Sequence, residues 1–217
     1  MDFEKARFNM VEQQIRPWEV LDPRVLDLLL QVKREDFVLP EQKNLAFVDM
    51  ELPLGNGSKM LHPKLEARIA QDVMVQTSDR ILQIGTGGAY LTALLARLGQ
   101  HVYAVDCDET ITERARAALT HAGIRNVTLK TGNGLEGLSE QAPFDIIVLC
   151  GSVSSVPDAL KAQLAVGGRL FAITGLSPLM EATLWTRETE TQWKSVALFE
   201  TDVEPLQGNA TPTRFAF

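Results

Sequence analysis

The sequence predicts an α/β fold in which a mostly parallel, Rossmann-like sheet carries helices on both faces. Between residues 80 and 174, apolar segments of strand length alternate with segments of helical periodicity. This alternation is typical of right-handed strand–helix–strand units. The segment 144–151 is apolar along most of its length, as expected for a strand covered on both faces. Gly85 and Gly87 follow the first of these strands and precede a helix, a position where doubly wound folds bind ligands.

Two helices are predicted ahead of the alternating region, as a helical cover for the sheet. Apolar residues recur at helical spacing between Phe3 and Val11, and this first helix is expected to end before Pro17. Asp22 is suited to an N-cap and Pro23 to the first helical position. A second helix with the sequence RVLDLLLQV is therefore expected to follow them.

A segment with little regular structure is predicted after the second helix. Residues 37–60 contain several prolines and glycines, which punctuate the chain. Pro63 is expected to open a third helix, with Leu65, Ile69 and Val73 on its apolar face.

The sheet itself is predicted from residue 80 onward. The predicted strands cover residues 80–84, 101–106, 126–131, 144–151, 167–174, 183–189 and 193–203. The helices between them are predicted at residues 90–98, 109–123 and 156–164. The last two strands are expected to form a hairpin at the sheet edge, and their order is left open.

The composition is that of one compact globular domain. The chain has 217 residues, of which 45% are hydrophobic and 23% are charged. The formal net charge is -7 and no basic run occurs. A protein held to nucleic acid by phosphate contacts needs a clustered basic face, so nucleic acid is not expected among the partners.

Cysteine spacing and hydropathy give further expectations. Cys107 and Cys150 lie in apolar segments without the spacing of metal ligands, so two reduced thiols and no metal site are expected. The N-terminus lacks an apolar signal core, and no apolar run approaches the ~18 residues needed to cross a membrane. A cytoplasmic protein without membrane contact is the expectation.

The glycine turn and a downstream acid together favour a cofactor that contains a nucleoside. Asp106 ends the second predicted strand, about 20 residues after Gly85, where a carboxylate can accept both hydroxyls of a ribose. A purely structural turn is the alternative. The dinucleotide fingerprint needs a third glycine where Tyr90 stands, which argues against a dehydrogenase. The shorter turn suits S-adenosylmethionine, which has no pyrophosphate.

Most of the chain, from about Met10 to Leu206, resembles the protein-L-isoaspartate (D-aspartate) O-methyltransferase family, and is similar to a divergent bacterial branch of it. The resemblance is carried by the motifs MVEQQIR, VKREDFVLPEQKNLAFVDMELPLGNG, ILQIGTGGAYLTALLA, VYAVD, TGNGLEG, APFDIIVLCGS, VPDALKAQLAVGGRL and VEPL. It implies a class I S-adenosylmethionine-dependent methyltransferase fold. It also implies methylation of the side-chain carboxylate of isoaspartyl residues in damaged proteins or peptides, which then collapse to a succinimide and are partly repaired.

The resemblance also implies a division of the chain and a set of site residues. Residues 1–62 would be the helical cover with the substrate loop, and residues 63–217 the methyltransferase core. Gly85, Thr86 and Gly87 would line the methionine part of the cofactor, Asp106 would bind the ribose and Asn133 would lie beside the adenine. The full set of cofactor-binding residues expected in this way is Gln83, Gly85, Thr86, Gly87, Tyr90, Asp106, Cys107, Asn133 and Gly134.

The chain departs from the family pattern at several positions. Ala89 stands where the family usually has the last glycine of the loop, Gln83 replaces an acid of the first strand, and Asn133 replaces an aspartate. The substrate loop of the family runs G-Q-T-I-S-x-P, and here Lys59 takes the threonine position and Leu61 the serine position. The hydroxyl nearest the substrate carboxylate is therefore missing.

Methyl transfer to a carboxylate makes modest demands on the protein. The cofactor supplies the electrophile, and a carboxyl group with a pKa near ~4 is already ionised at pH 7, so positioning is the main contribution. The candidate catalytic residues are Ser58, Lys59, Leu61 and His62, with Lys59 or Ser58 compensating for Leu61. An amine, phenol or carbon acid as acceptor would instead need His62 or Lys59 as a base. The remaining alternative is a cofactor-binding protein without catalysis.

Overall fold

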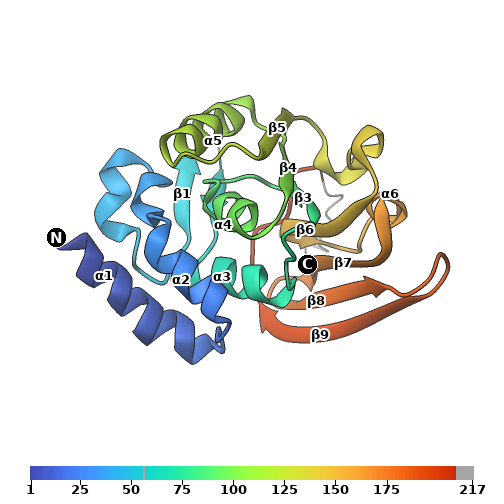
Figure 1. The fold of residues 1–217 in the computed structure, drawn as a ribbon, viewed down its shortest axis with the longest axis horizontal. Coiled ribbons are helices and arrows are strands. Elements are labelled where there is room, and N and C mark those ends of the chain that lie inside the picture. Colours follow the sequence, from blue (N-terminus) through green and yellow to red (C-terminus); the bar gives the residue numbers. More distant parts are fainter. Residues whose placement is uncertain (56, 209–217) are drawn as a thin grey trace, which may run out of the picture.

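The computed structural model describes residues 1–55 and 57–208, and its centre is one seven-stranded sheet (Figure 1). The strand order is β5-β4-β3-β6-β7-β8-β9, in which β3 to β7 run parallel and β8 and β9 antiparallel. The strands are β3 (Arg80–Ile84), β4 (His101–Asp106), β5 (Val127–Thr131), β6 (Phe144–Val153), β7 (Leu164–Leu176), β8 (Leu179–Arg187) and β9 (Trp193–Thr201). The mostly parallel α/β sheet predicted from the sequence is confirmed.

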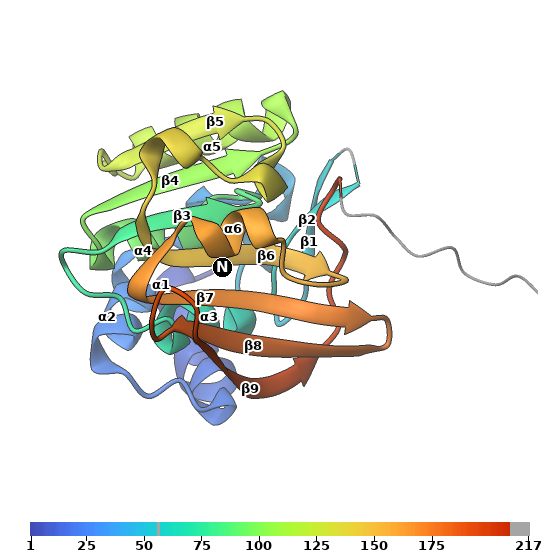
Figure 2. The same ribbon diagram turned by 90° about the vertical axis from the view of Figure 1, so that its right-hand side faces the viewer.

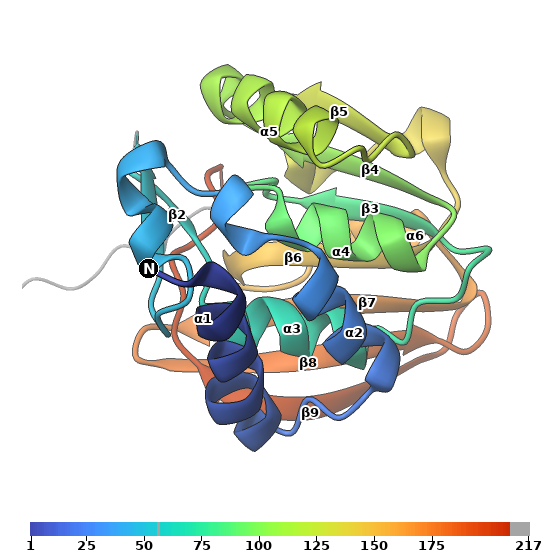
Figure 3. The same cartoon turned by 60° about the vertical axis from the view of Figure 1, so that its left-hand side comes forward.

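Helices cover both faces of this sheet, as predicted. The helices are α1 (Phe3–Met10), α2 (Pro23–Gln31), α3 (Pro63–Asp72), α4 (Tyr90–Leu98), α5 (Glu109–His121) and α6 (Asp158–Ala162). Figure 3 shows α3, α4 and α5 on one face with α1 and α2 packed outside them, and Figure 2 shows α6 on the opposite face. α2 begins as expected, because the Asp22 side chain accepts a hydrogen bond from the backbone N–H of Arg24 and Pro23 follows it.

The edge of the sheet that the sequence left open is a continuous antiparallel meander. β8 lies between β7 and β9, so the predicted hairpin extends the sheet beyond its parallel part. β7 and β8 are both longer than expected, and they pair with each other from Arg169 and Thr186 down to the turn between Leu176 and Leu179. The hydrophobic pattern of the sequence did not reveal these strand ends, because the additional residues next to the turn pair with each other at the tip of a hairpin.

The N-terminal helix continues past the expected stop. α1 is followed by a π-helical turn (Val11–Ile15) and a 3-10 turn (Arg16–Trp18), and Glu19 with φ of 61° ends the run. Pro17, which has no backbone N–H group to donate, lies in the 3-10 segment at the end of this run.

Residues 37–60 are more regular than predicted. A 3-10 helix covers Pro40–Leu45, and a small antiparallel hairpin is formed by β1 (Leu52–Gly55) and β2 (Ser58–Met60). Gly55 and Gly57 have φ of 90° and 77°, so glycines provide the left-handed backbone that this turn requires. Strands of three or four residues give too short a pattern for recognition in the sequence.

A buried arginine joins the N-terminal segments to the core. Arg34 is 0% exposed, and its Nε donates to Oε2 of Glu66 in α3 at 3.1 Å. Its Nη1 donates to the carbonyl of Ala46 and its Nη2 to the carbonyl of Leu61, both at 2.7 Å. One guanidinium therefore fixes three separate segments. Nearby, the buried Arg7 of α1 forms a second ion pair with Glu35.

Replacement of Arg34 by methionine is expected to lower the free energy of unfolding by about 3–5 kcal/mol, because it leaves Glu66 as a buried acid without its partner. Arg16→Met is the control, since Arg16 pairs with Glu12 at the surface, and it should change stability by less than about 1 kcal/mol. Urea denaturation of both variants measures the difference. Equal, small losses would contradict the central role of Arg34.

Candidate active site

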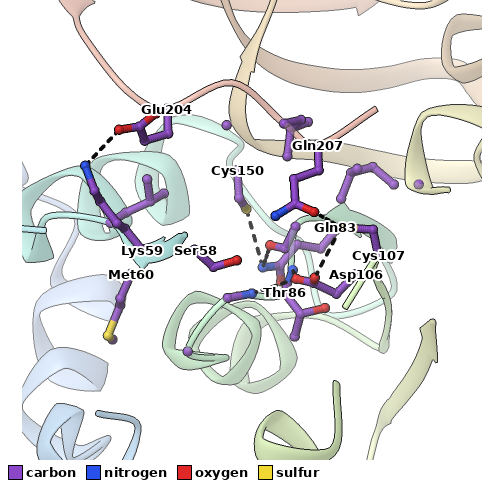
Figure 4. A pocket seen from close by; sticks show the side chains of 18 of the residues that line it. Ser58, Lys59, Met60, Gln83, Thr86, Asp106, Cys107, Cys150, Glu204 and Gln207 are labelled. Atoms are coloured by element: carbon purple, nitrogen blue, oxygen red, sulfur yellow. Dashed lines mark hydrogen bonds and ion pairs between the residues drawn. The ribbon is translucent and has the colours of Figure 1, made fainter. Parts of the chain in front are cut away.

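A cavity of about 300 Å³ lies at the carboxyl ends of β3, β4 and β6 (Figure 4). The β1–β2 hairpin closes one side of it, and the segment 203–207 crosses another. In a parallel sheet, loops from neighbouring strands meet at this edge, so residues distant in sequence come together there. Most residues predicted for the site line it, namely Ser58, Lys59, Leu61, Gln83, Gly85, Thr86, Gly87, Asp106, Cys107 and Gly134.

The loop after β3 exposes backbone to the cavity. Gly85 has φ of 86°, and a Cβ atom there would lie 3.1 Å from a methyl group of Leu206, so both conformation and space require glycine. Thr86 is buried, and its hydroxyl has no hydrogen-bond partner among the described residues. A polar group buried without a partner marks this loop as a place where a ligand can donate or accept.

Asp106 fixes the loop from the neighbouring strand. Its Oδ2 accepts hydrogen bonds from the backbone N–H groups of Thr86 at 2.8 Å and Gly87 at 3.2 Å. Its Oδ1 accepts from the backbone N–H of Asp108 at 3.2 Å. These donors orient the carboxylate at the end of β4. Its oxygens can accept further hydrogen bonds, and Asp106 lines the cavity. A vicinal diol fits these acceptors.

Gln83 and Cys150 form a buried polar contact at the base of the cavity. Gln83 is 1% exposed, and its Nε2 donates to the carbonyl of Gly85 at 3.1 Å and to Sγ of Cys150 at 3.4 Å. Its Oε1 has no hydrogen-bond partner in residues 1–55 and 57–208. Burial raises the pKa of the Cys150 thiol well above its usual range, so this thiol stays neutral and is not a nucleophile.

The substrate loop contributes a cation held by two acids. Nζ of Lys59 lies 2.8 Å from Oε1 of Glu204 and 3.3 Å from Oε2 of Glu51 (Figure 4). The hydrogen bond to Glu204, with that to Glu51, raises the pKa of Lys59, so the ammonium is charged at neutral pH. Ser58 and Leu61 line the same cavity, and the carbonyl of Leu61 is held by Arg34.

Three predicted site residues lie elsewhere. His62 points toward Asp49, with Nδ1 3.1 Å from Oδ1, in a surface pair outside the cavity. Tyr90 is fully buried against Phe37, with ring centroids 5.7 Å apart, because the first residue of α4 faces the N-terminal cover. The side chain of Asn133 caps the 3-10 turn that follows β5, through a bond from the N–H of Leu135 at 3.2 Å.

Other cavity residues were missed in the sequence. The segment 203–207 contains the VEPL motif (residues 203–206) and Gln207, and it had no predicted role. Its backbone pairs with Ser152, through Ser152 N–H to Glu204 O and Leu206 N–H to Ser152 O, both at 3.0 Å. Gln207 contacts Cys107, with Oε1 2.9 Å from Sγ. Glu66 also lines the cavity. One indication of this was present in the sequence, namely that Glu66 lies at the border of the apolar face predicted for the third helix.

The chemistry of the lining fits S-adenosylmethionine. Asp106 offers acceptors for the ribose hydroxyls, the loop 85–87 offers backbone groups, and apolar side chains that can flank an adenine come from Ile84, Val105 and Leu135. Within residues 1–55 and 57–208, no cluster of His, Cys, Asp or Glu could hold a metal ion. The same part of the chain has no helix that is long and apolar enough to span a bilayer.

Comparisons with known proteins agree with this geometry. A protein-L-isoaspartate O-methyltransferase from Koribacter versatilis (strain Ellin345) is 34% identical over 207 residues, which are 95% of this chain and 93% of that protein. A solved protein-L-isoaspartate O-methyltransferase is 26% identical with a TM-score of 0.79, over 95% of this chain and 66% of that chain.

A second solved structure shares the fold at lower identity. It is a Plasmodium falciparum protein named as a protein-L-isoaspartate O-methyltransferase in complex with S-adenosyl-L-homocysteine. It is 17% identical with a TM-score of 0.79, and the match covers 96% of this chain and 100% of that one. The family model described as protein-L-isoaspartate(D-aspartate) O-methyltransferase matches residues 5–200. This chain belongs to the protein-L-isoaspartate(D-aspartate) O-methyltransferase family.

Proposed function

We propose that this chain is an S-adenosylmethionine-dependent enzyme that methylates the side-chain carboxylate of isoaspartyl residues in damaged proteins or peptides. The observation that carries the proposal is one cavity in which the glycine loop, Asp106 and the substrate loop face one another, in a chain of this family. The Plasmodium falciparum structure of the same fold holds S-adenosyl-L-homocysteine.

In this proposal the protein acts mainly by positioning. The cofactor supplies a methyl group on a sulfonium centre, and Asp106 with the loop 85–87 holds it at the end of β4. An ionised carboxylate attacks the methyl carbon without a proton transfer, so the site needs no general base. Cys107 and Gly134 border the nucleoside in the same proposal, while Tyr90 and Asn133 support the walls from behind.

Lys59 is the residue proposed to hold the acceptor carboxylate. It lies where the family has threonine, and its ammonium is poised between Glu51 and Glu204. An incoming carboxylate can replace one of these partners, since both are partly exposed and such pairs are weak. Ser58 adds a hydroxyl beside it. Leu61 contributes only its apolar surface and its carbonyl.

One observation favours a second candidate, a methyltransferase with a different acceptor. The two acids around Lys59 offset its positive charge. This part of the cavity therefore attracts an anion less strongly than it would if Lys59 had no acidic partners. A neutral or cationic acceptor would profit from Glu51 and Glu204. Partners that exclude nucleic acid remain part of the proposal, which rests here on the net charge of -7. A cytoplasmic location stays a prediction.

Asp106→Ala is expected to weaken binding of S-adenosylhomocysteine by more than about 100-fold, because two charge-assisted hydrogen bonds to the ribose are lost. Isothermal titration calorimetry measures the affinity. Asp158→Ala, in the exposed first turn of α6, is the control and should bind as the wild type does. Unchanged affinity of Asp106→Ala would refute the ribose assignment.

Wild-type protein is expected to transfer labelled methyl groups to an isoaspartyl peptide and not to its aspartyl twin. Lys59→Met should lower kcat/KM for that peptide by about threefold to tenfold, and Lys59→Arg should retain most of it, because the cation orients the acceptor. Activity that appears only in a Leu61→Ser, Lys59→Thr double variant would favour the non-catalytic alternative. Equal labelling of both peptides would favour a changed acceptor.

A further inference from the structure

The buried end of the cavity is formed by Glu66, Gln83 and Cys150. Gln83 presents an oxygen, Oε1, that is buried and has no hydrogen-bond partner among the described residues. Its amide nitrogen is already engaged by Gly85 and Cys150, so this orientation leaves an acceptor and no donor toward the cavity. An acceptor held in this way calls for a ligand that donates.

Glu66 adds a carboxyl group to the same end. Its side chain is 4% exposed and lines the cavity. Oε2 accepts from Nε of Arg34 at 3.1 Å, and the backbone N–H of Leu91 also donates to the carboxyl group. Burial nevertheless raises the pKa of Glu66 to about 7, with Arg34 opposing this effect.

The surroundings of Glu66 offer it little further positive charge. Arg34 faces it from the 3-10 turn Arg34–Asp36 and donates to it through Nε, while Nη1 and Nη2 donate to the carbonyls of Ala46 and Leu61. Tyr90 approaches from α4 and Cys150 from β6, both neutral because burial raises the pKa of each. Behind Tyr90, Arg7 is paired with Glu35. Arg34 is thus the cation that pairs with Glu66, and burial outweighs its stabilising effect on the ionised carboxylate.

We propose that Glu66, with Oε1 of Gln83, binds the α-ammonium group of the methionine part of the cofactor. The family places an acid where this chain has Gln83, so Glu66 supplies from α3 the negative charge that the first strand no longer provides. The ammonium group has three donors and one positive charge, which match an unpartnered amide oxygen and a buried carboxylate that lines the same cavity. This inference rests on the proposed cofactor site and adds a binding residue to it.

The proposal has a consequence for pH. In the free protein, Glu66 is about half protonated near pH 7, whereas an ammonium group beside it favours the carboxylate. Binding therefore releases a proton below pH 7, and affinity rises as the pH increases from 6 to 8. Replacement of Glu66 by glutamine should remove this dependence.

The test is a comparison of two ligands by calorimetry, S-adenosylhomocysteine and its analogue without the α-amino group. Loss of the amino group should weaken binding to the wild type by about 10- to 150-fold, and to Glu66→Gln by no more than about threefold. Glu113→Gln is the control, because Glu113 is an exposed acid of α5 outside the cavity. It should show the wild-type difference.

The possible results distinguish failure of the role of Glu66 from failure of the cofactor site. A Glu66→Gln variant that keeps the full wild-type difference between the ligands overturns the role of Glu66. Wild-type protein that binds neither ligand overturns the proposed cofactor site itself. Should the variant fail to fold, titration of the wild type at pH 7 in buffers of different ionisation enthalpy decides, since binding without proton release overturns the proposal as well.

Discussion

The position of the whole acceptor side of the cavity depends on one buried guanidinium. Arg34 holds the carbonyls of Ala46 and Leu61 and the carboxyl group of Glu66, so the substrate loop, the cover and α3 share a single anchor. A guanidinium suits this role because its planar donors point in fixed directions and it stays charged when buried. The same burial excludes water from Glu66, and this desolvation raises the pKa of Glu66 to about 7.

A second constraint comes from the parallel sheet. The carboxyl ends of β3, β4 and β6 bring a glycine loop, an acid and a buried amide to one edge, and the carboxylate of Asp106 is oriented by N–H groups of the neighbouring loop. Catalysis by methyl transfer to an ionised carboxylate needs little more than such placement. Leu61 stands in the substrate loop where the family pattern has serine, and the charged groups around Lys59 define that part of the cavity.

The sequence predicted the sheet well because each buried strand and covering helix leaves a periodic pattern, and most cavity residues followed from the glycine loop and the strand ends. Prediction from the sequence failed for segments that have no periodic hydrophobic pattern. The hairpin β1–β2 is too short, and Tyr90 belongs to the cover interface although it directly follows the loop. Glu66 and the segment 203–207 reach the cavity only through tertiary packing. The division at residue 62 stays a prediction.

The segment 203–207 has a consequence for turnover. It is joined to Ser152 by a pair of backbone hydrogen bonds, and its side chains contact the glycine loop, Cys107 and Lys59. Local detachment of this strand-like segment would open the cavity for exchange of spent for fresh methyl donor, while the rest of the fold stays intact. In an enzyme that opened in this way, departure of the product and not the methyl transfer would set the pace of the catalytic cycle.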